Sequence, residues 1–304
     1  MTFTRFSPIP ASTHQRPESV RLPDFIAIGP PRTGTTWLHR VLEGHVGLPA
    51  GIKETQFFAW NHAKGLEWYH PFFRDAPRAL PAGEIAPACF DHPEARERIA
   101  ALIPRCRILC TLRDPIARLY SQYKVWHRAG LLEGPFDYAR QRHQLGASAS
   151  YALNLRQWQR IFGGSNVMVL FHDDLSAKPQ AYMDAVCDFI GIAKIDLAKS
   201  AIGTRRIGSS ARKPRSARMA IWGQRLRDRL IARRRVRLAR LLEAGAPLWP
   251  IFFAGGPPYP PLDPRTDIRL REQLRPEIEE LEELVGRDLS MWLAPRAEAG
   301  AASG

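Results

Sequence analysis

The sequence lacks a long uninterrupted hydrophobic run. Its most apolar stretch, near residues 241–261, is broken by prolines and glycines and is too short to span a bilayer. Residues 1–23 are polar and proline-rich, without the apolar core of a signal peptide, and predict a disordered arm. We therefore expect a soluble, cytoplasmic protein, with a second disordered segment at residues 294–304.

Cysteine is also scarce. The four cysteines, Cys89, Cys106, Cys110 and Cys187, form no Cys-x-x-Cys pair, so neither a disulfide framework nor a cysteine metal site is indicated. Cys106 and Cys110 lie in an apolar, strand-like run and are expected to be buried thiols. A reducing compartment fits this composition, and no metal is expected.

Acidic residues are few relative to basic ones. There are 30 Asp and Glu against 44 Lys and Arg, a formal net charge of +14, which predicts an anionic partner. That partner is a nucleic acid, a membrane surface or a highly charged small ligand. The basic residues concentrate after Thr204 and are not interleaved with aromatics, which argues against nucleic acid.

Strand-like and helix-like segments alternate along the chain. Three apolar runs of strand length are each followed by turn residues and a helical pattern; they are residues 24–28, 107–112 and 166–171. Amphipathic helices are predicted at residues 95–103, 151–162, 179–190 and 264–284. This alternation predicts an α/β fold with a mostly parallel sheet flanked by helices, in one domain over residues 24–293. A basic loop and a basic helix are expected within residues 204–242.

The segment Gly29–Leu38 follows the first predicted strand with the Gly-x-x-x-x-Gly spacing of a phosphate-binding loop. A strand that enters a glycine turn and then a helix directs backbone N–H groups and the positive end of the helix dipole at one point, which suits a phosphate. Thr35 occupies the position of the lysine that ATP- and GTP-binding loops use, and the loop's cation is Arg32. A nucleotide or small-molecule kinase with a degenerate loop stays open as an alternative.

Two further segments carry polar groups that suit phosphate or proton chemistry. Arg113 ends the second predicted strand, where a guanidinium reaches the crevice edge and can contact a phosphate in bidentate fashion, and Ser121 follows on the next helix. Lys53 and Glu54 adjoin an apolar cluster that could hold a carboxylate in a partly dry site. These residues alone favour an ordinary surface ion pair.

In order and spacing, these segments resemble three elements of PAPS-dependent sulfotransferases of the bacterial and heparan-sulfate type (PAPS is 3′-phosphoadenylyl sulfate). Gly29–Leu38 resembles the 5′-phosphosulfate loop. Lys53–Phe58 resembles the Lys-Glu-x-x-x-Phe element that carries the catalytic base. Arg113–Ser121 resembles the Arg-Asp-Pro-x-x-Arg-x-x-Ser element that holds the 3′-phosphate.

The resemblance implies a P-loop-like sulfotransferase fold and transfer of a sulfuryl group from PAPS to a hydroxyl or amine, releasing PAP. The acceptor is a small molecule, a lipid or a carbohydrate. The resemblance implies that Arg32 stabilises the leaving group and that Glu54, beside Lys53, is the catalytic base. His92 is the alternative base, because phenol-directed members of the family use a histidine. Trp37 either touches the adenine or packs in the core. The expected donor-binding residues are Pro31, Arg32, Thr33, Gly34, Thr35, Thr36, Trp37, Arg113, Ser121, Arg205, Arg206, Arg212 and Lys213.

The resemblance has departures and leaves one non-enzymatic alternative. Gly83–Pro87 is similar to the family's Gly-Glu-Lys-Ser-Pro element, but Ile85 replaces the lysine that lies near the acceptor in heparan-type enzymes. Asp173 replaces a family Glu, and Leu281–Leu293 resembles the family's C-terminal ending, with an expected packing role. The basic helix at residues 219–242 also fits a packed surface helix or contact with anionic membrane. A non-catalytic, membrane-peripheral nucleotide-binding protein is therefore the second alternative.

Overall fold

The computed structural model of this chain describes residues 21–137, 140, 147–200 and 255–295, together with 212–214, 216, 221, 222 and 229. Several predicted features lie outside the described residues: most of the N-terminal arm, Arg205 and Arg206, nearly all of the basic helix at 219–242, and the tail from residue 296. Among the described residues, no helix is long and apolar enough to cross a membrane.

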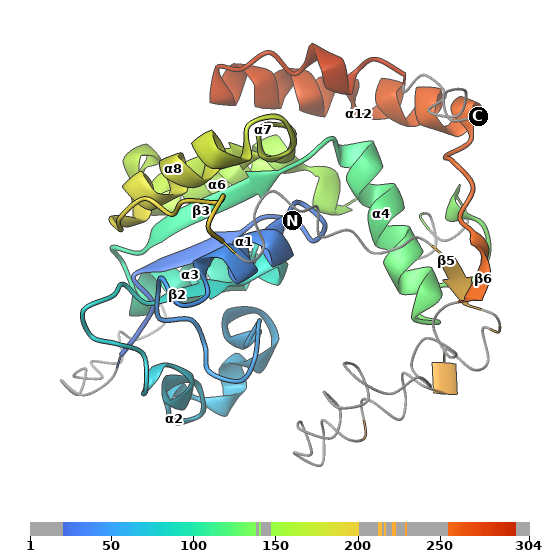
Figure 1. Cartoon of the computed structure of the whole chain (residues 1–304). Coiled ribbons are helices and arrows are strands. Elements are labelled where there is room, and N and C mark those ends of the chain that lie inside the picture. The colour runs from blue at the N-terminus through green and yellow to red at the C-terminus, as the bar shows by residue number, and fades with distance from the viewer. Residues whose placement is uncertain are drawn as a thin grey trace, which may run out of the picture.

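Strands and helices alternate as predicted (Figure 1). The strands are β1 (Phe25–Ile28), β2 (Gly83–Ile85), β3 (Arg107–Leu112), β4 (Val167–Phe171), β5 (Arg212–Pro214) and β6 (Gly255–Pro258). The α-helices are α1 (Thr35–Leu42), α2 (Leu66–Tyr69), α3 (Pro93–Leu102), α4 (Pro115–Arg128), α6 (Tyr151–Phe162), α7 (His172–Ala177), α8 (Pro179–Ile190) and α12 (Pro264–Val285). A π-helical turn, η1, spans Phe57–Asn61.

A parallel sheet in the order β2-β1-β3-β4 forms the centre of the fold. Each of its strands has a helical connection to the next, as parallel pairing requires. The carboxyl ends of β1 and β3 are neighbours, with Ile28 opposite Cys110. The loops that follow these two strands therefore meet at one edge of the sheet, where ligands bind in open α/β folds.

Alternate residues of the strands point to two separate cores. Ile26, Ile28 and Ile108 face a cluster with α3, α6 and α12, whereas Phe25 and Leu109 face a cluster with α1 and α8. Both faces are apolar because helices cover both, which is typical of a parallel sheet. This two-sided burial fixes the orientation of β1 and of the loop that follows it.

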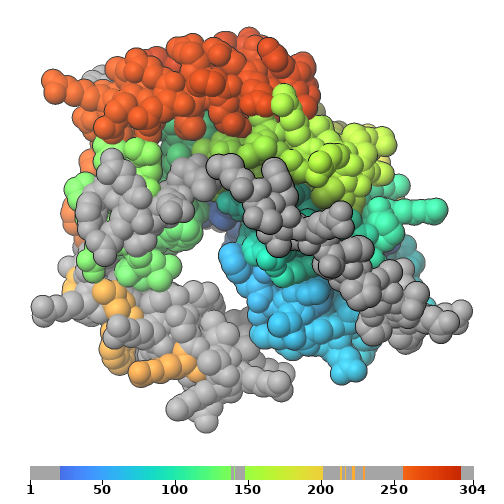
Figure 2. All heavy atoms as spheres, turned by 180° about the vertical axis from the view of Figure 1, so that it is seen from behind, coloured from blue at the N-terminus to red at the C-terminus, as the bar shows by residue number. Residues whose placement is uncertain are grey.

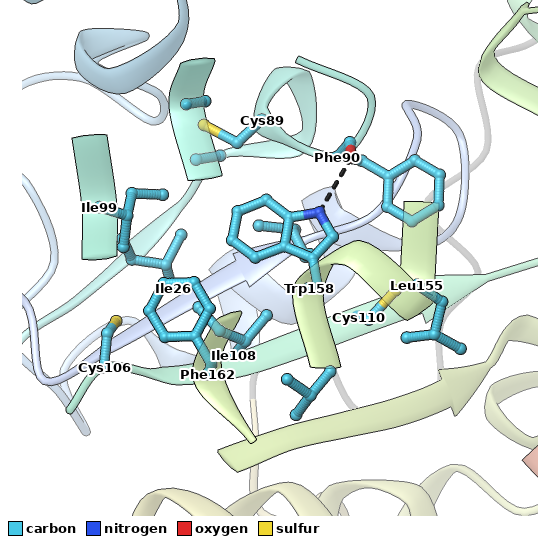
Figure 3. Packing of buried hydrophobic residues seen from close by; sticks show 14 of the residues in the cluster. Ile26, Cys89, Phe90, Ile99, Cys106, Ile108, Cys110, Leu155, Trp158 and Phe162 are labelled. Carbon is cyan, nitrogen blue, oxygen red and sulfur yellow. Dashed lines mark hydrogen bonds between the residues drawn. The ribbon is translucent and has the colours of Figure 1, made fainter. Parts of the chain in front are cut away.

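The predicted apolar stripe of α6 is confirmed as core. Trp158 is fully buried, and its indole Nε1 donates a hydrogen bond of 3.0 Å to the carbonyl oxygen of Phe90 (Figure 3). Leu155 and Phe162 lie in the same cluster. Cys106 and Cys110 are buried as predicted, and burial raises the pKa of both thiols, so they remain protonated at neutral pH.

The C-terminal segment packs against α6 and α7, in agreement with the packing role expected for it. Gly286 ends α12 in the left-handed conformation. The Trp292 Nε1 then donates to Asp173 over 2.7 Å, and the Arg287 guanidinium pairs with Asp174. These contacts join two of the segments that resemble the sulfotransferase family, and they support the expected structural role for the ending.

The proline-rich stretch near residue 258 belongs to a second, small sheet. Gly255–Pro258 forms β6 and pairs antiparallel with β5, beside α4. Figure 1 shows this small sheet near the end of α4 that is remote from the main sheet. The prolines permit an extended backbone, and pairing with a segment about 40 residues earlier is a tertiary effect that the local pattern does not carry.

Candidate active site

Two glycines shape the loop between β1 and α1. Gly29 has φ +126° and lies against β3, where a Cβ would overlap the carbonyl oxygen of Thr111. Gly34 has φ +103° and caps α1 in the left-handed region. The first N–H groups of a helix have no intrahelical acceptor. The backbone N–H groups of Thr33–Thr36 are therefore available for the predicted anion binding.

Arg32 lies in a strained part of this loop. Its φ is +81°, and among the described residues only one other non-glycine residue, Gln56, has positive φ, at +57°. The next residue, Thr33, is fully buried and anchored: its Oγ1 donates to the Pro30 carbonyl at 3.0 Å and lies 2.6 Å from the Thr111 Oγ1. Such backbone strain persists where surrounding contacts fix it, and it concentrates at functional sites.

The structure brings the two predicted phosphate elements together. The Arg32 Nε donates to the Ser121 Oγ on α4 at 3.1 Å, and the Arg113 Nη1 donates to the Arg32 carbonyl oxygen at 3.1 Å. Asp114 positions this arrangement because its carboxylate caps α4 through the N–H groups of Ile116 and Ala117. Residues about 80 to 90 positions apart in the chain thus form one basic cluster at the carboxyl edge of β1 and β3.

The electrostatics of this cluster favour an anion. Burial lowers the pKa of Arg32, and the positive charge of Arg128 lowers it further. Arginine stays charged at neutral pH, so burial next to a second positive charge is an unfavourable environment that a bound anion would relieve. Arg128 was not among the predicted site residues. It follows Ser121 by seven positions, two helical turns, and so shares a face of α4 with it, a spacing that could have identified it.

Lys53 and Glu54 reach the same loop from a different segment. The Lys53 Nζ lies 3.0 Å from the Thr36 Oγ1 and 2.6 Å from the Glu54 Oε1, and the Gln56 Nε2 donates to the Glu54 Oε2 at 2.9 Å. The Glu54 side chain is 23% exposed, so it is partly dry and still accessible. A carboxylate and a cation therefore stand beside the predicted phosphosulfate loop.

Three other predicted residues lie elsewhere. Trp37 is buried on the face of α1 that packs against α8, with its ring edge-to-face against Tyr182, so core packing accounts for it and we assign it no adenine contact. His92 precedes α3 and packs edge-on against the ring of Trp60, with centroids 4.9 Å apart. Lys213 on β5 lies over the Tyr259 ring, near His127 of α4.

An open gap is visible on one face of the molecule (Figure 2). Figure 2 shows it between the green helix α4, which carries Ser121, and the light-blue segment that contains η1 and α2 and follows Glu54. The arrangement as a whole is that of an α/β protein with a basic cluster at the carboxyl edge of its sheet and a carboxylate next to it, which suits binding of an anion.

Comparison with known proteins identifies the family. The family model for the sulfotransferase domain matches residues 22–202, more than half of the 304-residue chain, and the chain therefore belongs to the sulfotransferase family. A solved sulfotransferase structure from Alicyclobacillus acidocaldarius superposes with a TM-score of 0.63 at 19% identity, covering 90% of this chain and 100% of that one. The predicted P-loop-like sulfotransferase fold is confirmed.

The curated relatives are larger proteins. The chain is 30% identical over 196 residues to bifunctional heparan sulfate N-deacetylase/N-sulfotransferase 4 of Mus musculus. It is 28% identical over 196 residues to bifunctional heparan sulfate N-deacetylase/N-sulfotransferase 2 of Homo sapiens. These matches cover 56% and 57% of this chain but 22% of each relative, so the chain spans under a quarter of their length.

Proposed function

We propose that this protein is a PAPS-dependent sulfotransferase that transfers a sulfuryl group to a hydroxyl or amine. The observation that carries the proposal is the contact of Arg32 with both Ser121 and Arg113. It joins the phosphosulfate loop to the predicted 3′-phosphate element, and PAPS is a ligand with anionic groups at both ends of one nucleoside. The family membership supports the same reaction.

The residues present fit this co-substrate. The loop amides of Thr33–Thr36 would hold the 5′-phosphosulfate, and the guanidinium of Arg113 with the Ser121 hydroxyl would hold the 3′-phosphate. A single phosphate would satisfy one of these groups. The proposed donor site does not depend on the other predicted residues, Arg205, Arg206, Arg212 and Lys213.

In the proposed step the acceptor oxygen or nitrogen attacks the sulfur, and the bond from sulfur to the bridging oxygen of PAPS breaks. Glu54 takes the acceptor proton, and the electron pair of the broken bond stays on the 5′-phosphate of PAP. Arg32 and the loop N–H groups stabilise that developing charge. Lys53, which contacts both Thr36 and Glu54, keeps the base next to the loop.

One donor, PAPS, is proposed, but several chemical classes of acceptor are compatible with the site. The curated relatives are named for heparan sulfate N-sulfotransferase activity, which makes an amine or hydroxyl of a carbohydrate one candidate. Ile85, where the family places a lysine, is fully buried in the core beside α1 and α8. This position therefore brings no cation to the acceptor, and a neutral small molecule or lipid fits as well as a sugar.

PAP should raise the melting temperature more than ATP or AMP at equal concentration, because PAP engages both phosphate positions. Excess EDTA should leave this stabilisation unchanged. Differential scanning fluorimetry measures it directly. Equal stabilisation by Mg-ATP, lost on addition of EDTA, would instead support the kinase alternative.

Arg113→Ala should weaken PAP binding by about 1.5–3 kcal/mol, the scale of a charge-assisted contact. The same substitution should weaken the binding of adenosine 5′-phosphosulfate much less, because that ligand lacks the 3′-phosphate. Isothermal titration of both ligands tests this, with Arg107→Ala at the opposite end of β3 as the matched control. Similar losses for the two ligands would remove Arg113 from the 3′-phosphate site.

A further inference from the structure

A fully buried carboxyl group lies beneath the segment that carries Glu54. Glu84 on β2 is 1% exposed, although glutamate is rarely buried without partners. Its Oε1 accepts hydrogen bonds from the backbone N–H of Thr55, at 3.0 Å, and from the Thr55 hydroxyl. Its Oε2 accepts from the Tyr69 hydroxyl of α2 at 2.5 Å.

The partners of Glu84 act as donors toward it. Burial raises the pKa of Tyr69 well above its ordinary value, and the adjacent Glu84 charge raises it further, so the phenol keeps its proton. Burial also raises the pKa of Glu84, while the bonds from Thr55 and Tyr69 oppose that effect. Glu84 is therefore an acceptor that closes a small buried network between β2, α2 and the residue after Glu54.

The network controls a strained piece of backbone. Thr55, held by Glu84 at two atoms, stands between Glu54 and Gln56, and Gln56 has the positive φ noted above. The Thr55 hydroxyl also accepts from the N–H of Phe57 at 3.1 Å and so fixes the start of the π-helical turn. Two hydrogen bonds to a rigid strand restrict the position of the residue next to Glu54 far more than one flexible contact would.

We infer that Glu84 is a positioning residue for the proposed base: by holding Thr55 it keeps the Glu54 carboxylate beside the Thr36 end of the phosphosulfate loop. The inference rests on the proposed function of Glu54. Glu84 touches neither donor nor acceptor in this account. Its removal should reduce the rate of transfer while leaving PAP affinity close to that of the unmodified protein.

The test uses three variants of the full chain. Glu84→Leu removes every acceptor, whereas Glu84→Gln keeps an amide oxygen for Thr55. Tyr69→Phe is the matched control because it removes one donor of the same buried network and leaves both Thr55 bonds intact. Melting temperatures and PAP affinities are measured for each, so that loss of stability is separated from loss of positioning.

Turnover is followed as PAP release from PAPS with the fastest acceptor of a panel containing p-nitrophenol, glucosamine and octanol. Glu84→Leu should lower kcat about 10–100-fold, the effect of a misplacement of about 1 Å. Glu84→Gln should keep most of the kcat of the unmodified protein. Tyr69→Phe should have a kcat close to that of the unmodified protein. When Glu54→Gln is already present, adding Glu84→Leu should lower kcat little further, because the carboxylate that Glu84 positions has already been removed.

Amide exchange gives a readout that does not depend on turnover. Peptides covering residues 52–58 should exchange faster in Glu84→Leu than in Tyr69→Phe. The inference is overturned if exchange is equal in these two variants, or if Glu84→Leu costs the same factor with and without Glu54. If PAP does not raise the melting temperature of the unmodified protein, that result would instead contradict the proposed function itself.

Discussion

Glu54→Gln should lower turnover by about 10²–10⁴-fold, the usual contribution of a positioned general base. The glutamine keeps the size and the hydrogen-bonding shape of the side chain but cannot accept the acceptor's proton. PAP affinity should stay nearly intact, because the proposed donor contacts come from the loop, Arg113 and Ser121. Turnover and PAP titration on the same preparation measure the two effects separately.

His92→Ala is the informative control for this result. His92 packs against Trp60, outside the Lys53–Glu54–Thr36 contacts, so its removal should leave turnover within a few-fold of the unmodified protein. Turnover that survives Glu54→Gln and disappears in His92→Ala would reverse the assignment. The site would then be nearer to that of the phenol-directed sulfotransferases, which use a histidine as the base.

Arg32→Ala should lower turnover by about 10²–10³-fold at saturating PAPS, the cost of removing a group that stabilises charge as it develops in the transition state. Arg32→Lys should retain much of the rate because it keeps a cation at the leaving group. The charge of Arg128 should not substitute, since it belongs to a helix face whose position is fixed by the packing of α4.

Arg40→Ala is the matched comparison for Arg32. Arg40 lies in the last turn of α1 and is exposed, so its removal changes the net charge equally without touching the loop. Steady-state kinetics on both variants decide the point. Equal and small losses of turnover in Arg32→Ala and Arg40→Ala would show that only the net positive charge of the protein matters. Arg32 would then have no specific role at the leaving group.

The periodic elements were the most predictable part of this fold. The limits of β3, α6 and α8 agree with the apolar runs and helical stripes, because each element buries one regular face. β2 was not predicted as a strand. It has three residues, Gly83–Ile85, and its strand conformation depends on pairing with β1, information that is non-local.

The site was predictable where a motif fixed both residue type and spacing. Arg32, Ser121 and Arg113 were placed in one site from the sequence, and the structure shows the three in contact. Arg128 and Glu84 were missed as site residues. Arg128 shares a face of α4 with Ser121, a helical spacing that could have identified it, whereas Glu84 acts on Thr55 from a separate strand and leaves no local pattern in the chain.

The most direct test of the central claim is a crystal structure of the protein with PAP. The account predicts the 5′-phosphate against the backbone N–H groups of Thr33–Thr36, with the Arg32 guanidinium beside it. It predicts the 3′-phosphate within hydrogen-bond distance of Arg113 and Ser121. A nucleotide bound elsewhere, or one whose 3′-phosphate points away from both side chains, would contradict it.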